Sequence, residues 1–334
     1  MSADATHRLD GLEPDNLLAF LALLGVLRAL NAVDRREEKG LRPRASWDLQ
    51  QQPHRPMLHL ACTTTRDQVA EFIAEGVSLL AEDHDFGGRS DLNHPQTDAR
   101  ELLVAATESA DASRRGRVDL LASLLTDAAV KSTETIDPTP LCLLFGQGHQ
   151  HFLDRLASVP ALPAPPPRRN GEVAVAISAA ECISEALFKP WLRQDPTFSF
   201  RWDPQEDVRY ALMAGDPTDQ AFKERTQHGA NRLAAVGLAA LTVVPQTRAG
   251  RVRPQVIGGM SSHAGFSFAW PIWGEPASLA AIRSLLGHPQ LRESGLRHLG
   301  VAYVMVARRM SVGKFMNFAQ AQVRSGSQNT ATAP

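Results

Sequence analysis

Arginine and aromatic side chains in the second half of the chain are the residues best suited to chemistry. Arg251 and Arg253 stand at alternate positions of a predicted strand, so both project from one face. Guanidinium groups form bidentate hydrogen bonds with phosphates, and Trp or Tyr rings stack on unpaired bases. Two interpretations stay open: a nucleic-acid face, or a surface sheet with arginine stems packed along it. The basic residues concerned are Arg201, Arg209, Arg248, Arg251, Arg253, Arg308, Arg309 and Lys314.

Three histidines offer the main alternative, which is an enzyme. His149 and His151 have a spacing that suits metal ligation in an extended segment, and His263 follows two serines. A zinc site needs at least a third protein ligand, and a serine nucleophile elbow needs a glycine two residues after the serine. The sequence around these histidines signals neither. It therefore predicts no catalytic residue, no metal site and no cofactor, with a metal-dependent nuclease or hydrolase as the alternative.

Charge and composition limit the partners of the chain. It has 334 residues, with 35 Lys+Arg against 36 Asp+Glu and a formal net charge of −1. Any contact with nucleic acid must therefore come from a local basic patch. The three cysteines are too sparse for a disulfide framework, and the first ten residues lack the apolar run of a signal peptide. These features predict a cytoplasmic protein that contacts no membrane and, alone, binds nucleic acid weakly.

Hydrophobic patterning predicts an α+β fold in two lobes. A helix over residues 15–30 is apolar nearly all round, but its uncharged stretch is too short to cross a bilayer. We therefore expect it in the core of a helix-rich N-terminal lobe, residues 1–159. Residues 160–171 hold five prolines and form the predicted linker. Residues 172–324 form a C-terminal lobe of mixed sheet and helix, and residues 325–334 a disordered tail.

Shorter elements follow from caps and alternation. Thr65 and Ser178 begin capping boxes and therefore start helices. A further helix carries Phe152 and Leu156. Helices are also expected over residues 98–108, 118–130, 228–241 and 278–286, and strands over residues 45–49, 57–62, 141–145, 198–202, 252–257, 266–270 and 301–307.

Four blocks of sequence together resemble a known family. Residues 10–29 join a Gly-Leu-Glu-Pro-Asp-Asn start to a leucine-rich helix, and residues 148–153 read Gly-His-Gln-His-Phe-Leu. The most specific block, residues 200–234, has the order Phe-Arg-Trp-Asp-Pro, Arg-Tyr-Ala-Leu, Asp-Pro and Gly-Ala-Asn-Arg-Leu-Ala. Residues 266–273, Phe-Ser-Phe-Ala-Trp-Pro-Ile-Trp, close the match. The whole resembles proteins of type I-G (formerly I-U) CRISPR loci, which are related in pattern to the large subunits of type I interference complexes.

The resemblance implies a non-catalytic component of a type I-G CRISPR antiviral interference system of the Cascade kind. Such a component assists assembly of the crRNA-guided complex, target DNA binding or helicase-nuclease recruitment. Its partners would be other effector subunits or the helicase-nuclease, with crRNA and target DNA in the complex. A purely protein-binding adaptor is a further alternative.

The family-like block also divides its residues between two roles. It adds Arg232 to Arg201 and Arg209 as candidate nucleic-acid contacts. Other motif residues suit a structural role, such as fixing a turn and a helix start. They are Trp202, Asp203, Pro204, Tyr210, Asp216, Gly229, Asn231, Trp270 and Trp273.

Overall fold

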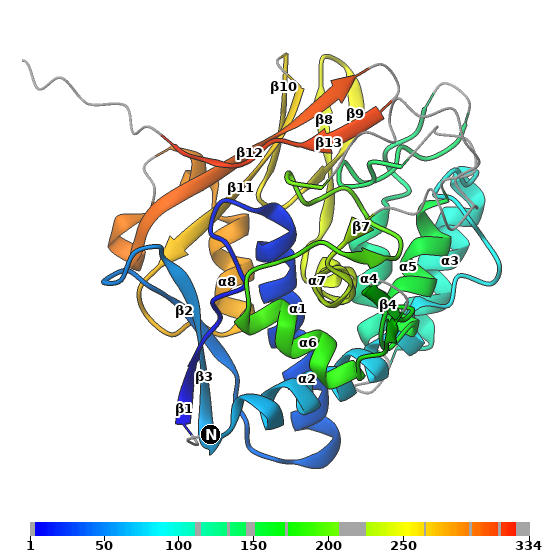
Figure 1. The fold of residues 1–334 in the computed structure, drawn as a ribbon. Coiled ribbons are helices and arrows are strands. Elements are labelled where there is room, and N and C mark those ends of the chain that lie inside the picture. Colours follow the sequence, from blue (N-terminus) through cyan, green and yellow to red (C-terminus); the bar gives the residue numbers. More distant parts are fainter. Residues whose placement is uncertain are drawn as a thin grey trace, which may run out of the picture.

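The chain folds into an α+β structure in which helices pack against small antiparallel sheets (Figure 1). This predicted fold class is confirmed. The computed structural model describes residues 4–110, 115–131, 134–144, 151–170, 173–206, 225–263, 265–293, 296–312 and 315–324. The predicted disordered tail, residues 325–334, lies outside them.

Most of the helices lie in the first two thirds of the chain. The capping boxes predicted at Thr65 and Ser178 are both formed, and each begins its helix as expected. The helices are α1 (Leu17–Glu37), α2 (Arg66–Ala81), α3 (Gln96–Glu108), α4 (Arg115–Leu124), α5 (Phe152–Ala161), α6 (Ala179–Phe188), α7 (His228–Gly237) and α8 (Leu279–Gly287).

The strands form several separate antiparallel sheets. The first has the order β1-β3-β2, from β1 (Asp4–Arg8), β2 (Arg44–Asp48) and β3 (Arg55–Thr64). The largest has the order β10-β11-β12-β13, with β14 also paired to β12; its strands are β10 (Gly259–Ser262), β11 (Gly265–Trp273), β12 (Val301–Val312), β13 (Phe315–Phe318) and β14 (Gln322–Val323). The remaining pairs are β4 (Arg168–Asn170) with β5 (Val173–Val175), β6 (Asp195–Pro196) with β7 (Arg225–Thr226), and β8 (Val243–Arg248) with β9 (Arg251–Val256).

Helix α1 is the centre of the hydrophobic core. Every residue from Leu17 to Leu30 is buried, and the ring of Phe20 stacks on that of Trp270 in β11, with centroids 5.5 Å apart. By length and composition α1 is the one helix of the described residues that passes as a membrane span, but 83% of its apolar stretch is buried inside the protein. Its apolar surface is therefore covered by the protein itself, as predicted for the core helix.

Two glycines bring α1 and α7 into backbone contact. A Cβ atom on Gly25 would lie 1.9 Å from the carbonyl oxygen of Leu233, and one on Gly237 would lie 2.2 Å from that of Leu21. Only glycine leaves room for such an approach, because real side chains never come so close to a backbone oxygen. The two helices therefore cross at a distance that the two glycines set.

The described residues form one main core, which differs from the predicted division into two lobes. A single hydrophobic cluster contains residues from before and after the segment 160–171, including Leu24 of α1 and Leu233 of α7. The segment itself begins inside α5 and ends in β4. Its carbonyl groups at Pro160 and Pro163 accept hydrogen bonds from the buried Arg232. The proline-rich segment therefore packs across the core and does not separate two cores.

Two predicted strands are wrong. Residues 141–144 form a turn and irregular backbone, and no strand covers residues 198–202. In the second segment Arg201 has a φ of 62°, a left-handed conformation that ends any extended run. The alternating Phe198, Phe200 and Trp202 are explained by aromatic packing, since Phe200 stacks on Trp202 at 4.5 Å.

We predict that Gly25→Ala lowers the free energy of unfolding by about 1–3 kcal/mol, because the added methyl group forces α1 and α7 apart. Denaturant unfolding followed by circular dichroism measures the change. Gly287→Ala in α8 is the matched control, since the nearest atom to its Cβ lies 3.9 Å away. Equal losses in the two variants would contradict the close approach.

Candidate nucleic-acid interface

The exposed arginines gather on the hairpin formed by β8 and β9. The turn between these strands consists of Ala249 and Gly250, with φ values of 48° and 73°. Two successive left-handed residues make the tight turn whose twist matches the flanking strands, and glycine is well suited to it. In Figure 1 the hairpin lies beside β10 at the top of the molecule.

Three arginines share one face of this hairpin. The strand register pairs Arg248 with Arg251, and Gln246 with Arg253. Because paired residues and their alternate neighbours point to the same side, Arg248, Arg251 and Arg253 project together. Arg251 and Arg253 are both exposed. We call this surface the arginine hairpin, defined by Arg248, Arg251 and Arg253.

Two contacts hold the arginine hairpin in place. Arg248 donates a hydrogen bond of 2.5 Å to the carbonyl oxygen of Ser261 in β10, which joins the hairpin to the neighbouring sheet. Arg253 lies 3.9 Å from a carboxylate oxygen of Asp137, yet 56% of its side chain remains exposed. The hairpin is therefore anchored at one arginine and keeps the other guanidinium groups open to solvent.

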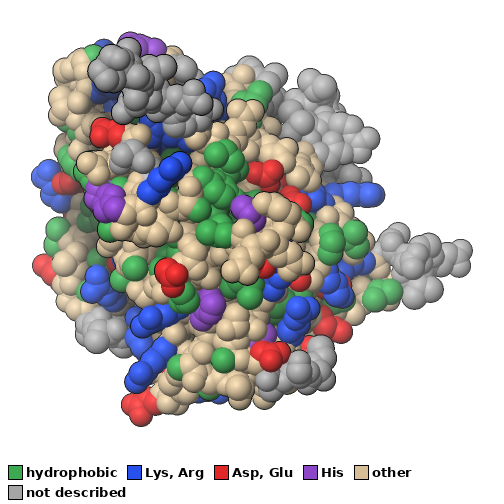
Figure 2. All heavy atoms as spheres, turned by 90° about the vertical axis from the view of Figure 1, so that its left-hand side faces the viewer, with side chains coloured by type: hydrophobic (Ala, Val, Ile, Leu, Met, Phe, Trp, Pro, Cys, Tyr) green, Lys and Arg blue, Asp and Glu red, His purple; other side chains and the backbone are tan. Residues whose placement is uncertain are grey.

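Local charge distinguishes this region from the rest of a nearly neutral chain. Strands β8 to β14 contain no aspartate or glutamate, and their charged residues are Arg248, Arg251, Arg253, Arg308 and Arg309. On the face that Figure 2 shows, basic and acidic side chains are interspersed. The C-terminal strands are thus a basic region within a molecule that carries no bulk field.

Arg308 and Arg309 point to opposite sides of β12. Arg308 is exposed, opposite Ser267 of β11. Arg309 instead donates a 3.0 Å hydrogen bond to the carbonyl oxygen of Pro140, and its guanidinium lies 5.4 Å from the centre of the Phe266 ring. Burial lowers the pKa of Arg309. Of this predicted pair, Arg308 suits a surface contact and Arg309 has a packing role.

The structure contradicts the prediction that Arg201 and Arg232 contact nucleic acid. Arg232 is fully buried and donates three hydrogen bonds of 2.8–3.3 Å to the carbonyl oxygens of Pro160 and Pro163, while burial lowers its pKa to about 10. Arg201 is only 3% exposed. Both arginines are enclosed by the core, so a phosphate does not reach them. Arg209 and Lys314 lie outside the described residues.

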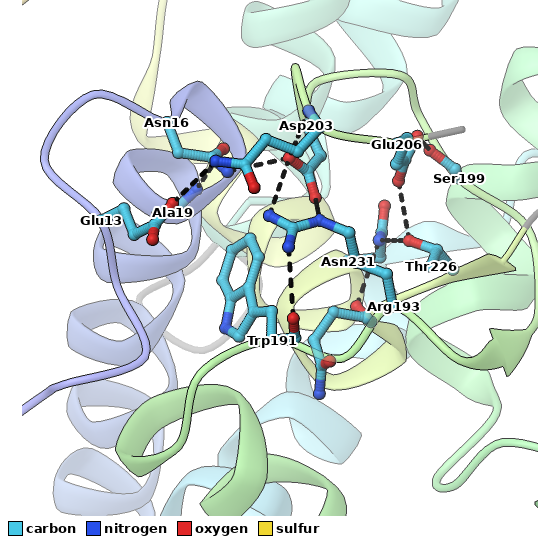
Figure 3. Close-up of polar contacts among 12 residues, drawn as sticks. Glu13, Asn16, Ala19, Trp191, Arg193, Ser199, Asp203, Glu206, Thr226 and Asn231 are labelled. Carbon is cyan, nitrogen blue, oxygen red and sulfur yellow. Dashed lines mark hydrogen bonds and ion pairs between the residues drawn. The ribbon is translucent and has the colours of Figure 1, made fainter. Parts of the chain in front are cut away.

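The motif residues of the family-like block instead secure the start of α1 (Figure 3). Asn16 caps α1 by accepting from the backbone of Ala19, and its side-chain amide donates a 2.9 Å hydrogen bond to Asp203. The same carboxylate accepts from Arg193 at 2.7 and 3.3 Å and from the backbone of Gln205 at 3.0 Å. The buried Asp203 carboxylate therefore links the start of α1, the turn at Gln205 and the Arg193 guanidinium. This is the structural role that the sequence suggests for Asp203.

A second polar cluster lies next to the first. In Figure 3 the Glu206 carboxylate faces Ser199 and Thr226, and it accepts from both hydroxyl groups, from Thr226 at 2.7 Å. Asn231 of α7 donates to the Thr226 hydroxyl at 2.6 Å, and its own amide oxygen accepts from the backbone of Phe200 at 3.4 Å. Residues 199–206 have irregular backbone without β-ladder hydrogen bonds, and the side chains of this cluster provide hydrogen-bond partners there instead.

The remaining motif residues also have structural roles. The indole N–H groups of Trp202, Trp270 and Trp273 donate to the carbonyl oxygens of Leu141, Pro14 and Ala45, at 2.9, 3.1 and 2.7 Å. Gly229 allows α7 to approach α6, because a Cβ there would lie 2.4 Å from the Cys182 oxygen. Pro204 follows Asp203 in the turn. Tyr210 and Asp216 lie outside the described residues.

The histidines of the enzyme alternative do not meet among the described residues. His151 bonds to Asp91 at 2.9 Å, whereas His263 lies in the exposed connection between β10 and β11. His149 is outside the described part of the chain. Within that part, no three His, Cys, Asp or Glu side chains are grouped to hold a metal ion.

Sequence reasoning missed two buried histidines. His84 donates from Nδ1 to the Leu156 oxygen at 2.8 Å, and His228 bonds through Nε2 to the Leu162 oxygen at the same distance. Burial lowers the pKa of each to about 4, so both imidazoles are neutral near pH 7. His84 stands outside the motifs and His228 directly precedes the Gly-Ala-Asn-Arg run without being part of it, so only the tertiary structure reveals their burial.

Comparison with known proteins identifies no relative of the chain. No protein-family model, no curated protein and no solved structure matches it. The functional proposal below therefore rests on the sequence resemblance and on the geometry of the described residues.

We predict that Asp203→Asn lowers the free energy of unfolding by about 3 kcal/mol, because it leaves the Arg193 guanidinium without its buried counter-charge. Denaturant unfolding measures the loss. Asp10→Asn is the control: Asp10 also pairs with an arginine, but 41% of its side chain is exposed, so the expected loss stays below about 1 kcal/mol. A small loss in Asp203→Asn would show that the network does not hold the start of α1.

The two buried histidines, His84 and His228, should make the stability of the protein depend on pH. The unfolded chain binds protons at His84 and His228 below about pH 6.5, whereas the folded chain binds them only near pH 4. The free energy of unfolding should therefore fall as the pH drops from 7 to 5, by up to about 1.4 kcal/mol per pH unit for each histidine. Denaturant unfolding at several pH values tests this. His84→Gln should flatten the slope and the exposed His298→Gln should not; unchanged slopes in both would refute the assignment.

Proposed function

We propose that the chain is a non-catalytic component of a type I-G CRISPR interference system, and that its arginine hairpin contacts nucleic-acid phosphates in the effector complex. The observation that carries the proposed phosphate contact is the charge of the C-terminal strands, which hold five arginines and no acidic residue; the CRISPR role rests on the sequence resemblance. The planar guanidinium group of arginine can donate two parallel hydrogen bonds to two oxygens of one phosphate. Partners in this role are other effector subunits or the helicase-nuclease, with crRNA and target DNA, in the cytoplasm.

The family-like residues share one region of the fold. Three of the blocks that carry the resemblance meet around α1: the Leu18 amide donates to the Trp202 oxygen at 3.2 Å, and Phe20 stacks on Trp270. These residues are far apart in the sequence, and their contacts with one another help to specify one fold. The resemblance therefore concerns the scaffold, and the proposed contact lies on a different surface.

The near-neutral charge fits a subunit better than an autonomous DNA-binding protein. Phosphate contacts release counter-ions, and a protein with few contacts binds weakly at physiological salt. Within a ribonucleoprotein, base pairing to the guide reads the target while protein side chains hold the backbone. The arginine hairpin provides such a contact without making the whole chain basic.

The proposal predicts that Arg251→Glu with Arg253→Glu weakens binding of the chain, or of its effector complex, to DNA by roughly tenfold or more at low salt. The dependence of log affinity on log salt concentration should also fall by about two, because two phosphate contacts are lost. Fluorescence anisotropy of a labelled duplex across a salt series measures both quantities.

Arg100→Glu with Arg115→Glu is the matched control. These two arginines lie on helices α3 and α4, their side chains are 63% and 72% exposed, and each neighbours an aspartate, as Arg253 does. Unchanged binding in the hairpin variant, or equal loss in both, would contradict the phosphate contact. Metal-dependent cleavage of DNA or RNA that His→Ala substitution abolishes would favour a nuclease. Co-purification with effector subunits but no binding of nucleic acid would favour an adaptor.

A further inference from the structure

One face of the largest sheet is open to solvent where β10 lies beside β11 and the second half of β12. Ser267 of β11 is paired with Met260 of β10 on one side and with Arg308 of β12 on the other, so these three side chains point the same way. Met310, two residues after Arg308, shares their side. We call this surface the open sheet face, defined by Met260, Ser267, Arg308 and Met310.

The rest of the same sheet is committed to the interior. Its opposite face carries Phe268 and Ala307, which are buried in the main core. At the other end of the open side, Ala269 and Val304 are buried in a second apolar cluster with Leu291. The residues of the open sheet face belong to neither cluster. Their side chains are therefore available for contact with another molecule.

Positive charge gathers at the open sheet face. Arg308 is exposed and forms no ion pair with any described residue. The half-buried Arg292 donates to the Ser267 hydroxyl at 3.3 Å and to the carbonyl oxygens of Ser267 and Gly258 at 2.9 and 2.6 Å, which are all neutral acceptors. Burial and the nearby charge of Arg324 lower the pKa of Arg292 to about 10, so it stays a cation at pH 7. Two guanidinium groups therefore flank Ser267.

Two exposed methionines stand on either side of Arg308. The side chains of Met260 and Met310 are 43% and 48% exposed. From strand geometry, Met310 lies about 7 Å from Arg308 along β12, and Met260 about 10 Å away across two strand spacings. The polarizable thioether of methionine makes favourable contacts with aromatic rings. A ligand that contacts all three residues would therefore combine negative charge with flat rings.

A nucleic-acid strand with unpaired bases has this combination. Its phosphates supply negative charge, and its bases expose ring faces that a duplex keeps stacked and hidden. The open sheet face also continues into the arginine hairpin, because Arg248 donates to the carbonyl oxygen of Ser261, the neighbour of Met260 in β10. A strand held at the hairpin can therefore pass directly onto the sheet.

We propose that the open sheet face binds single-stranded nucleic acid, with Arg308 on a phosphate and Met260 and Met310 against bases. Arg292 supplies a fixed positive charge beside them. The inference rests on the proposed function, since it extends the nucleic-acid path that begins at the arginine hairpin. It adds a preference for an unpaired strand, which phosphate contacts at the hairpin do not predict.

The test measures binding of the full chain to a labelled oligothymidylate and to a duplex of the same length, by fluorescence anisotropy across a salt series. Met260→Ser with Met310→Ser should weaken binding to the single strand by about threefold or more and leave duplex binding unchanged. The salt dependence should stay the same, because no phosphate contact is lost. Arg308→Gln should instead lower the slope of log affinity against log salt by about 0.7 for the single strand.

Val104→Ser in α3 is the matched control, because Val104 is an apolar side chain as exposed as Met310, at 48%. It should bind both probes as the unmodified chain does. No binding of the oligothymidylate by the unmodified chain at low salt would overturn the inference. An equal effect of the methionine changes on single strand and duplex, or no effect on either, would also overturn it.

The variant Arg251→Glu with Arg253→Glu, measured alongside, separates this inference from the proposed function. If the hairpin variant loses binding while the open-face variants do not, the inference fails and the hairpin contact stands. If the open-face variants alone lose single-strand binding, the hairpin contact fails and the open sheet face stands. Loss of effector subunits from the methionine variant, with unchanged affinity for nucleic acid, would identify a protein partner and overturn the inference.

Discussion

The complete burial of α1 is the constraint on which the rest of the structure depends. A helix that is apolar nearly all round has no face for water, so other elements must cover it on every side. Helix α7 covers one side at glycine-limited distance, β11 covers another through Trp270, and α2 packs along a third. These covering elements come from widely separated parts of the sequence, so burying α1 draws the chain into one main core.

Burying a helix also buries its end, and this explains the polar residues around residue 203. The first amides of α1 have no partners within the helix, and the core offers no water to satisfy them. The Asn16 side chain and the Trp202 carbonyl accept from two of these amides, Asp203 accepts from the Asn16 side chain, and Arg193 balances the charge of Asp203. Residues that are conspicuous in sequence therefore serve the scaffold. The contact surface that we propose, the arginine hairpin, consists of other residues, whose side chains are not committed to the core.

The sequence predicts those parts of the structure that local chemistry controls. The capping boxes at Thr65 and Ser178, the buried α1 and the shared face of Arg251 and Arg253 all follow from residue type and spacing. What could not be predicted depends on distant contacts. Arg232 is buried because the proline-rich segment offers carbonyl groups that form no β-ladder hydrogen bonds. Through the same contact this segment, which we expected to be a linker, packs against the core. A cavity lined by Ser158, Pro196 and other residues of separate stretches is likewise not predictable, because these stretches leave no common signal.

The scaffold and the proposed contact surface consist of different residues, so the decisive question is where nucleic acid lies in the complex. Gln246 is exposed on the face of the arginine hairpin, opposite Arg253, whereas the exposed Thr247 points to the other face. A photoreactive phenylalanine analogue placed at each position in a reconstituted effector complex tests the claim directly. We expect cross-links to crRNA or target DNA from position 246 and far fewer from position 247. Cross-links to protein alone, or equal yields from both positions, would contradict it.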